Sequence, residues 1–112
     1  MIEIIVLKYL ETALTVPVVT EIPNKPIERF VLLKKADGSE SDHLSFAMFT
    51  VQSYGPSMVE AAMLNQTVKA AMKRIIELDE ISGCHLNSDY NFTDTASKRY
   101  RYQAVFDIYH YC

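Results

Sequence analysis

The stretch KRYRYQAVFDIYHY, from Lys98 to Tyr111, decides the fold of this chain. Its apolar side chains recur at every second residue, which is the period of a β-strand. A strand with aromatic residues on one pleated face needs a layer of helices over that face, so the sequence predicts a sheet packed against helices. That face would carry Tyr100, Tyr102, Ala104, Phe106 and Ile108, and the opposite face Arg99, Arg101, Gln103 and Asp107.

The basic start of this stretch also raises the possibility of nucleic-acid binding. The chain has 112 residues, a formal net charge of -3 and an isoelectric point near 5.5. Affinity for a phosphate backbone comes from clustered Lys and Arg side chains, and Arg99 and Arg101 are too few to follow one. Nucleic-acid binding is therefore the least favoured function. With 49% hydrophobic residues, the chain is expected to form one globular domain over residues 1–112.

The rest of the chain supplies the other elements of an α+β fold. The S-x-x-E spacing of Ser57 and Glu60 is typical of a helix start, and the apolar stripe that follows it is the clearest helical pattern in the chain. We expect a mostly antiparallel β-sheet packed against two α-helices, with a long protruding β-hairpin. The expected bounds are helix 2–14, strands 18–22, 29–35 and 44–54, helix 57–79, and strands 84–92 and 99–110.

Two of these strands carry a further expectation. In the strand over 44–54 the apolar phase shifts from Phe46 and Met48 to Phe49 and Val51, so either a bulge intervenes or both faces are covered. The strand over 84–92 alternates, with Cys84, Leu86, Ser88, Tyr90 and Phe92 on one side. A helix on one face of the sheet and a neighbouring subunit on the other would explain strands that are apolar on both faces.

Catalytic and metal-binding patterns are not evident. Three glycines cannot build a phosphate-binding loop, and adjacent Cys84 and His85 would point to opposite faces of a strand. The residue types would allow Cys84 as a nucleophile with His110 or His43 as its base, but no sequence motif supports this pair. We therefore expect no enzyme, cofactor or metal, and free thiols at Cys84 and Cys112. The N-terminus, interrupted by Glu3, Lys8 and Glu11, predicts neither a signal peptide nor a membrane span, hence a protein assembled in the cytoplasm.

Three stretches together resemble one protein family: ERFVLLKK (Glu28 to Lys35), FTVQSYGPSMVEAAMLNQTVKAAM (Phe49 to Met72) and NSDYNFTDTASKRYRYQAVFDIYHY (Asn87 to Tyr111). The chain is similar, over most of its length, to the tail-terminator or tail-completion proteins of long-tailed phages and prophages of Gram-positive bacteria. The resemblance implies an α/β sandwich without catalytic residues. It implies a ring, commonly of six subunits, that caps the tail tube, stops its polymerisation and presents the surface that joins the head connector.

The resemblance also implies partners and contact residues. The hairpin tip, with Asp37, Gly38, Glu40 and Asp42, is the expected contact with the tail-tube protein or the connector. The expected subunit contacts are Tyr54, Arg99, Arg101 and Tyr109. DNA would only pass through the ring, and the protein would lie at the head-proximal end of the tail in the virion. The alternatives are a head-completion or adaptor protein, and a small dimeric α/β ligand-binding domain.

Overall fold

Residues 100–111 of the C-terminal stretch KRYRYQAVFDIYHY form β5 (Tyr100–Tyr111), an interior strand of the sheet. The structure is a computed structural model that describes residues 1–25, 27–39, 44–97 and 99–111. On β5, Ala104, Phe106 and Ile108 belong to the main hydrophobic core, as the alternation predicted. Opposite them, Arg101 and Asp107 are only half-buried. The period of two therefore reports correctly which face meets the helices.

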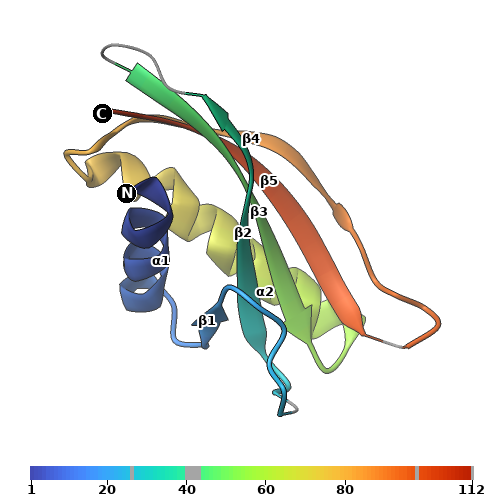
Figure 1. Ribbon diagram of the computed structural model, residues 1–112. Helices are drawn as coiled ribbons and strands as arrows, with labels where there is room; N and C mark the ends of the chain where they lie inside the picture. Colours follow the sequence, from blue (N-terminus) through green and yellow to red (C-terminus); the bar gives the residue numbers. More distant parts are fainter. Residues whose placement is uncertain (26, 40–43, 98, 112) are drawn as a thin grey trace.

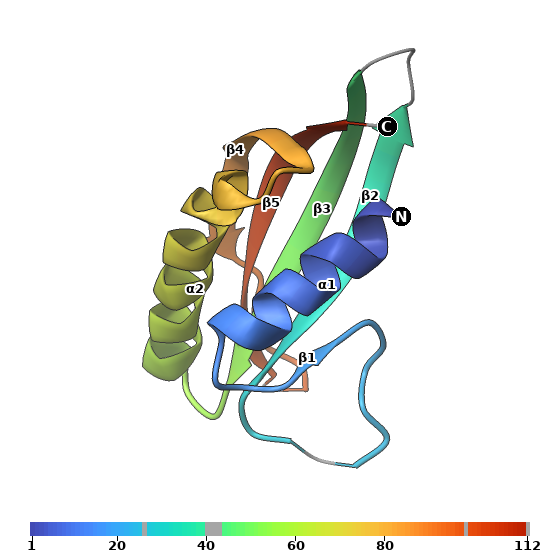
Figure 2. The same ribbon diagram turned by 90° about the vertical axis from the view of Figure 1, so that its left-hand side faces the viewer.

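In the described part of the chain, two α-helices and five strands form an α+β fold, which confirms the expected fold class (Figure 1). The sheet order is β1-β2-β3-β5-β4, and every neighbouring pair is antiparallel except β1 and β2. Both helices lie against the same face of the sheet (Figure 2). The other face, here called the open face, carries neither helix. The elements are α1 (Ile2–Ala13), β1 (Val18–Val19), β2 (Phe30–Ser39), β3 (Leu44–Gly55), α2 (Met58–Lys73), the 3₁₀ turn η1 (Ile75–Glu77), β4 (Ile81–Asn91) and β5.

The second helix begins as predicted but ends earlier. The Ser57 hydroxyl accepts a hydrogen bond of 3.2 Å from the backbone N–H of Glu60, which caps the start of α2. The helix was expected to continue to residue 79, but it ends at Lys73 and η1 follows. The tighter turn keeps Ile75 fully buried while Ile76 is 54% exposed. This change of direction brings the chain to β4, whose first residue, Ile81, is also buried.

The N-terminal half of the sheet corrects two predicted strand bounds. The strand expected over 18–22 pairs only at Val18 and Val19, so its last three residues lie outside the sheet. The strand expected to end at 35 continues to Ser39, with an irregularity in register between Lys35 and Asp37. One inserted residue lets the polar end of β2 follow β3 although its side-chain pattern is no longer apolar.

The hairpin of β2 and β3 is present, but its protrusion is not established. β3 pairs with β5 over its whole length, as far as Leu44 opposite Tyr111, so the described part of the hairpin belongs to the sheet. The expected tip residues Glu40 and Asp42 lie outside the described residues. No register shift occurs between β3 and β5. Phe49 and Val51 therefore face the helices, while Phe46 and Met48 lie half-exposed on the open face.

In β4 the predicted alternation is wrong beyond Leu86. A shift in register between Leu86 and Ser88 moves the following residues by one position. Cys84 packs against the main core, and Leu86 stands opposite Phe106 on the same face. Beyond the bulge it is Asp89, not Tyr90, that reaches the helix side, where its carboxylate accepts a hydrogen bond from α2. A bulge depends on the partner strand, so the single-strand pattern did not reveal it.

Candidate functional site

Three of the four predicted subunit-contact residues meet at one end of the open face. The Tyr54 ring stacks on Phe30, with centroids 4.4 Å apart and planes 8° from parallel. Its hydroxyl accepts a hydrogen bond of 3.0 Å from Arg101 Nη1 and donates one of 3.0 Å to Gln52 Oε1. Tyr54 is only 3% exposed. Tyr54 therefore lies beneath the exposed side chains of the open face, and almost none of its own surface is accessible to a partner.

The two arginines of this cluster are held differently. The Arg101 guanidinium lies 4.5 Å from the Phe92 ring centroid, and its Nε donates a hydrogen bond of 2.8 Å to the Phe92 carbonyl. Arg99 lies over the Tyr54 ring at 5.3 Å and is exposed. Cation–π contacts orient a guanidinium without neutralising its charge. Arg99 is consequently the member of the cluster that is best placed to meet a carboxylate from outside.

A polar network continues from this cluster across the sheet. Gln52 Nε2 donates a hydrogen bond of 2.7 Å to Gln103 Oε1, and Gln103 Nε2 in turn donates to the Tyr90 hydroxyl. These side chains come from β3, β5 and β4, so one row of hydrogen bonds crosses three strands. Because each partner is satisfied, the row stiffens the open face rather than leaving buried polar atoms without partners.

Tyr109 lies apart from the other predicted subunit contacts. Its ring centroid is 5.4 Å from that of Phe46 and 6.0 Å from that of His85. Tyr109 lies eight positions after Arg101 along β5, and it stands opposite Phe46 near the hairpin end of β3. The structure thus brings together Tyr54, Arg99 and Arg101 but not Tyr109.

The predicted hairpin-tip residues fall on both sides of the described boundary. Asp37 and Gly38 belong to β2 and are exposed, and Asp37 Oδ1 accepts a hydrogen bond of 2.8 Å from the Gly38 N–H. They pair with Met48 and Ala47 of β3. Their placement corrects the prediction that they form part of the tip.

The cysteine expected to be inert has the environment of an inert thiol. Burial against the core, together with the smaller effect of the nearby Asp107 carboxylate, raises the pKa of Cys84 to about 11. A thiol with such a pKa is almost entirely protonated at neutral pH, whereas the nucleophile is the thiolate. His85 is turned toward Tyr109 and exposed, and His43 lies outside the described residues. Among the described residues no group of His, Cys, Asp and Glu side chains could hold a metal ion.

A partly buried polar contact between α2 and β4 was not anticipated. Asn65 is 1% exposed, and its Nδ2 donates a hydrogen bond of 2.7 Å to Asp89 Oδ1. Lys69, one turn later, forms an ion pair with the same carboxylate. The apolar stripe predicted on α2 did not include Asn65, because hydropathy ranks asparagine as a surface residue. The i, i+4 spacing of Asn65 and Lys69 was the available signal.

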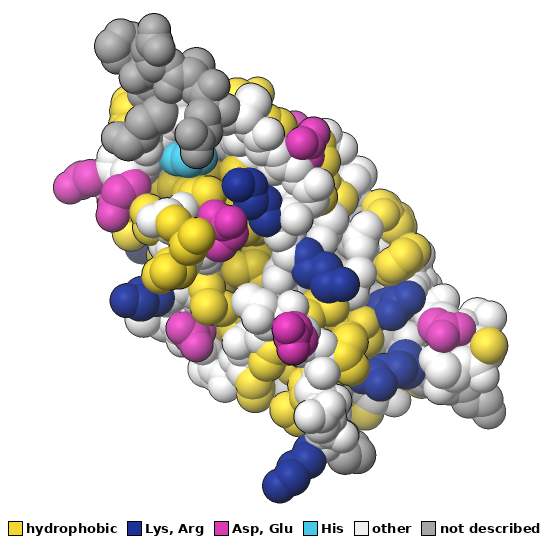
Figure 3. Space-filling model, in the orientation of Figure 1, with side chains coloured by type: hydrophobic (Ala, Val, Ile, Leu, Met, Phe, Trp, Pro, Cys, Tyr) yellow, Lys and Arg dark blue, Asp and Glu magenta, His cyan; other side chains and the backbone are white. Residues whose placement is uncertain are grey.

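The surface charge is mixed. In Figure 3, basic, acidic and hydrophobic side chains are interspersed over the visible face, and no single-sign patch dominates that view. No helix in the described part of the chain is long and apolar enough to cross a membrane.

No protein-family model matches the chain, and no curated protein matches it at a significant level.

Proposed function

We propose that this protein is a tail terminator of a long-tailed phage or prophage, which forms a ring on the tail tube, stops its polymerisation and presents the head-joining surface. The supporting observation is the element order. The resemblance implies a helix, strands, a hairpin, a second helix and two further strands in an α/β sandwich, and α1 to β5 follow that order with both helices on one face.

The open face and the two unlike sides of the sandwich are compatible with a ring. Ring interfaces join two different patches of the subunit head to tail. The sandwich has α1 beside β1 on one side and α2 beside β4 on the other (Figure 2). On the open face, the exposed Arg99 is held over a buried tyrosine and has no ion-pair partner within the described ranges. Its proposed partner is a carboxylate of a neighbouring subunit.

In the proposed particle the protein lies at the head-proximal end of the tail. It contacts the tail-tube protein on one side and the head-completion protein on the other, and DNA passes through the ring without being a specific ligand. The proposed role requires no catalytic group, cofactor or metal. The proposed ring is a hexamer of identical subunits.

The test is light scattering of the purified protein across a concentration series, alone and with its tail-tube protein, followed by electron microscopy of the largest species. A ring with a central hole that caps tube ends and halts their growth is the expected result. A ring that binds only the head connector would identify an adaptor protein instead. A two-fold dimer that never grows would contradict both and favour a small binding domain.

A further inference from the structure

The sandwich has two flanks of different character. On the first, called the α1 flank, α1 stands beside the edge strand β1 and the chain that follows it, residues 20–22. On the second, called the α2 flank, α2 stands beside the other edge strand, β4 (Figure 2). Each flank combines one helix side with one sheet edge.

The α2 flank offers unpaired backbone groups. The N–H of Phe92 donates to the Arg101 carbonyl at 2.9 Å, and that of Tyr111 to the Glu80 carbonyl at 3.0 Å. Odd-numbered residues of β5 therefore point their backbone groups toward β4. In an antiparallel pair, residues that exchange hydrogen bonds alternate with residues that do not. Cys84 and Leu86 stand opposite even-numbered residues of β5, so their N–H and C=O groups point away from β5, toward the outside of the sheet. This edge is open to another strand.

A groove runs beside this edge. It has a volume of about 440 Å³ and lies between α2 and β4. Leu86, which is 49% exposed, and Phe106 contribute apolar surface, and Lys69 and Lys73 of α2 contribute cations. Lys69 is neutralised by Asp89, whereas Lys73 is exposed and forms no ion pair with any described residue. The groove thus suits an apolar side chain next to an acid.

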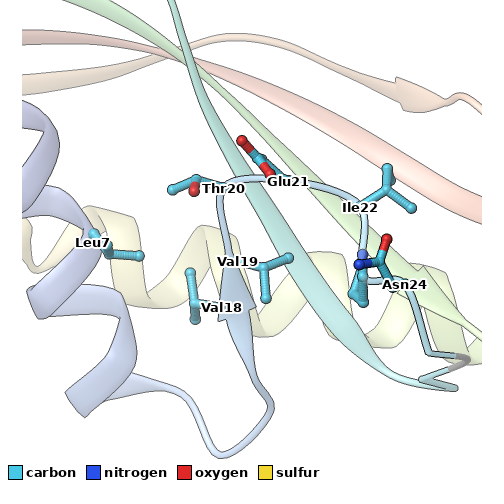
Figure 4. A pocket seen from close by; sticks show the side chains of 8 residues that line it. Leu7, Val18, Val19, Thr20, Glu21, Ile22 and Asn24 are labelled. Carbon is cyan, nitrogen blue, oxygen red and sulfur yellow. The ribbon is translucent and has the colours of Figure 1, made fainter.

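The α1 flank presents those two features. The chain that follows β1 bends at Thr20 and Glu21, and Ile22, which is 46% exposed, lines a hollow of about 420 Å³ (Figure 4). Glu11 and Glu21 are both exposed and form no ion pair within the described ranges. Leu7 lines the hollow, and Glu11 follows it by four residues, so it continues the same row of α1.

We infer that the α1 flank of a second copy docks on the α2 flank, with its residues 18–22 added as a strand to the edge of β4. Within one subunit, β1 runs antiparallel to β4. If the second copy has the same orientation as the first, its β1 is also antiparallel to the β4 on which it docks, and the helices of both copies lie on the same face of the joined sheets. Val18 faces the main core. The docking requires that the bend at Thr20 and Glu21 straightens, because only in an extended chain does Ile22 share the face of Val18 and enter the groove. Glu11 then approaches Lys73. This inference rests on the proposed ring.

The contact explains the strand pattern over 18–22, of which only two residues pair within one chain. It also matches acids to a cation across the interface, which favours this partner over other proteins with an exposed strand. Strand addition supplies main-chain hydrogen bonds, and the groove and the charges supply the register.

The test uses charge exchange on the full chain. Glu11→Lys and Lys73→Glu should each weaken association by on the order of tenfold, because each places like charges opposite one another. The double variant should recover most of the loss. Lys8→Glu is the matched control, an exposed α1 lysine outside the Leu7–Glu11 row, and should leave association unchanged. Association is measured by sedimentation, and circular dichroism verifies that each variant is folded.

Residue-resolved hydrogen exchange gives a second measurement. On assembly, the amides of Cys84 and Leu86 should become protected, whereas that of His85, which already faces β5, should change little. If rings still form with both charge-reversal variants, and the exchange rates of these amides do not change on assembly, this contact would be overturned but the ring would not. Protection of β4 without any effect of Glu11→Lys would indicate a β4-to-β4 contact and would also overturn it. A wild-type protein that stays monomeric, even with the tube protein, would refute the ring and the contact together.

Discussion

Arg101 donates a hydrogen bond of 3.0 Å to the hydroxyl of Tyr54, directly opposite it on the neighbouring strand. Two residues that the sequence suggested as contacts between subunits are thus bound to each other within one subunit. This hydrogen bond holds in place the Tyr54 ring, over which the Arg99 guanidinium lies. The contribution of these residues to any interface is consequently indirect, through the position of Arg99.

Tyr54→Phe should lower the free energy of unfolding by about 1–2 kcal/mol, because it removes the hydrogen bonds to Arg101 and Gln52 and leaves both partners partly buried. The stack on Phe30 is retained. Urea unfolding followed by circular dichroism measures the change. Tyr111→Phe, at a position that is 57% exposed, is the control and should have almost no effect. Equal midpoints for both variants would mean that the hydroxyl of Tyr54 contributes nothing.

Gly55 and Gly83 should respond differently to alanine. A Cβ at Gly55 would lie 2.7 Å from the backbone nitrogen of Ala61, at the start of α2. Gly55→Ala should therefore cost about 1–3 kcal/mol of stability, since backbone must move. A Cβ at Gly83 would meet its nearest atom at 3.6 Å, an ordinary contact. Gly83→Ala should be neutral or slightly stabilising by thermal unfolding, and the reverse order would contradict the packing of α2 against β3.

Cys84 should react slowly with iodoacetamide at pH 7 and faster only as the pH approaches about 11, where burial has placed the pKa of its thiol. The pKa is raised from 9.0, so the contribution of this group is present below about 9 and is lost as the pH rises through about 11. Alkylation of the folded Cys112→Ser variant, followed by mass spectrometry, isolates this thiol. Rapid labelling at pH 7 would show that burial does not raise the pKa of this thiol, and Cys84 would again be a candidate nucleophile.

The turn between β4 and β5 should loosen in acid. Ser97 donates its hydroxyl to Asp94 at 2.7 Å, and the N–H of Ala96 donates at 3.0 Å, and these hydrogen bonds lower the pKa of the carboxyl below 3.8. The stability that they contribute is present above the ordinary pKa and is lost as the pH falls through the lowered one. The amide chemical shifts of Ala96 and Ser97 should follow this titration and lose it in Asp94→Ala. A midpoint above 3.8 would show that the turn does not favour the ionised form.

Local patterns were sufficient for the fold class and for most elements. The period of two in residues 99–110 predicted which side of β5 meets the helices, and the capping pattern at Ser57 predicted where α2 begins. Both signals depend on one segment and the burial of its faces, which hydropathy records. Bounds that depend on other segments were less accurate, as at the end of α2 and in the short β1.

The candidate site required the tertiary structure. The sequence by itself determined that the chain would alternate strands with two amphipathic helices, because spacing along one segment decides which side chains share a face. Only the folded chain decided that a bulge after Leu86 would bring Asp89 to Asn65, and that the hydroxyl of Tyr54 would bind Arg101 of the same subunit. These contacts join residues far apart in the chain, and strand pairing between such segments is set by register and packing. No local period encodes that register.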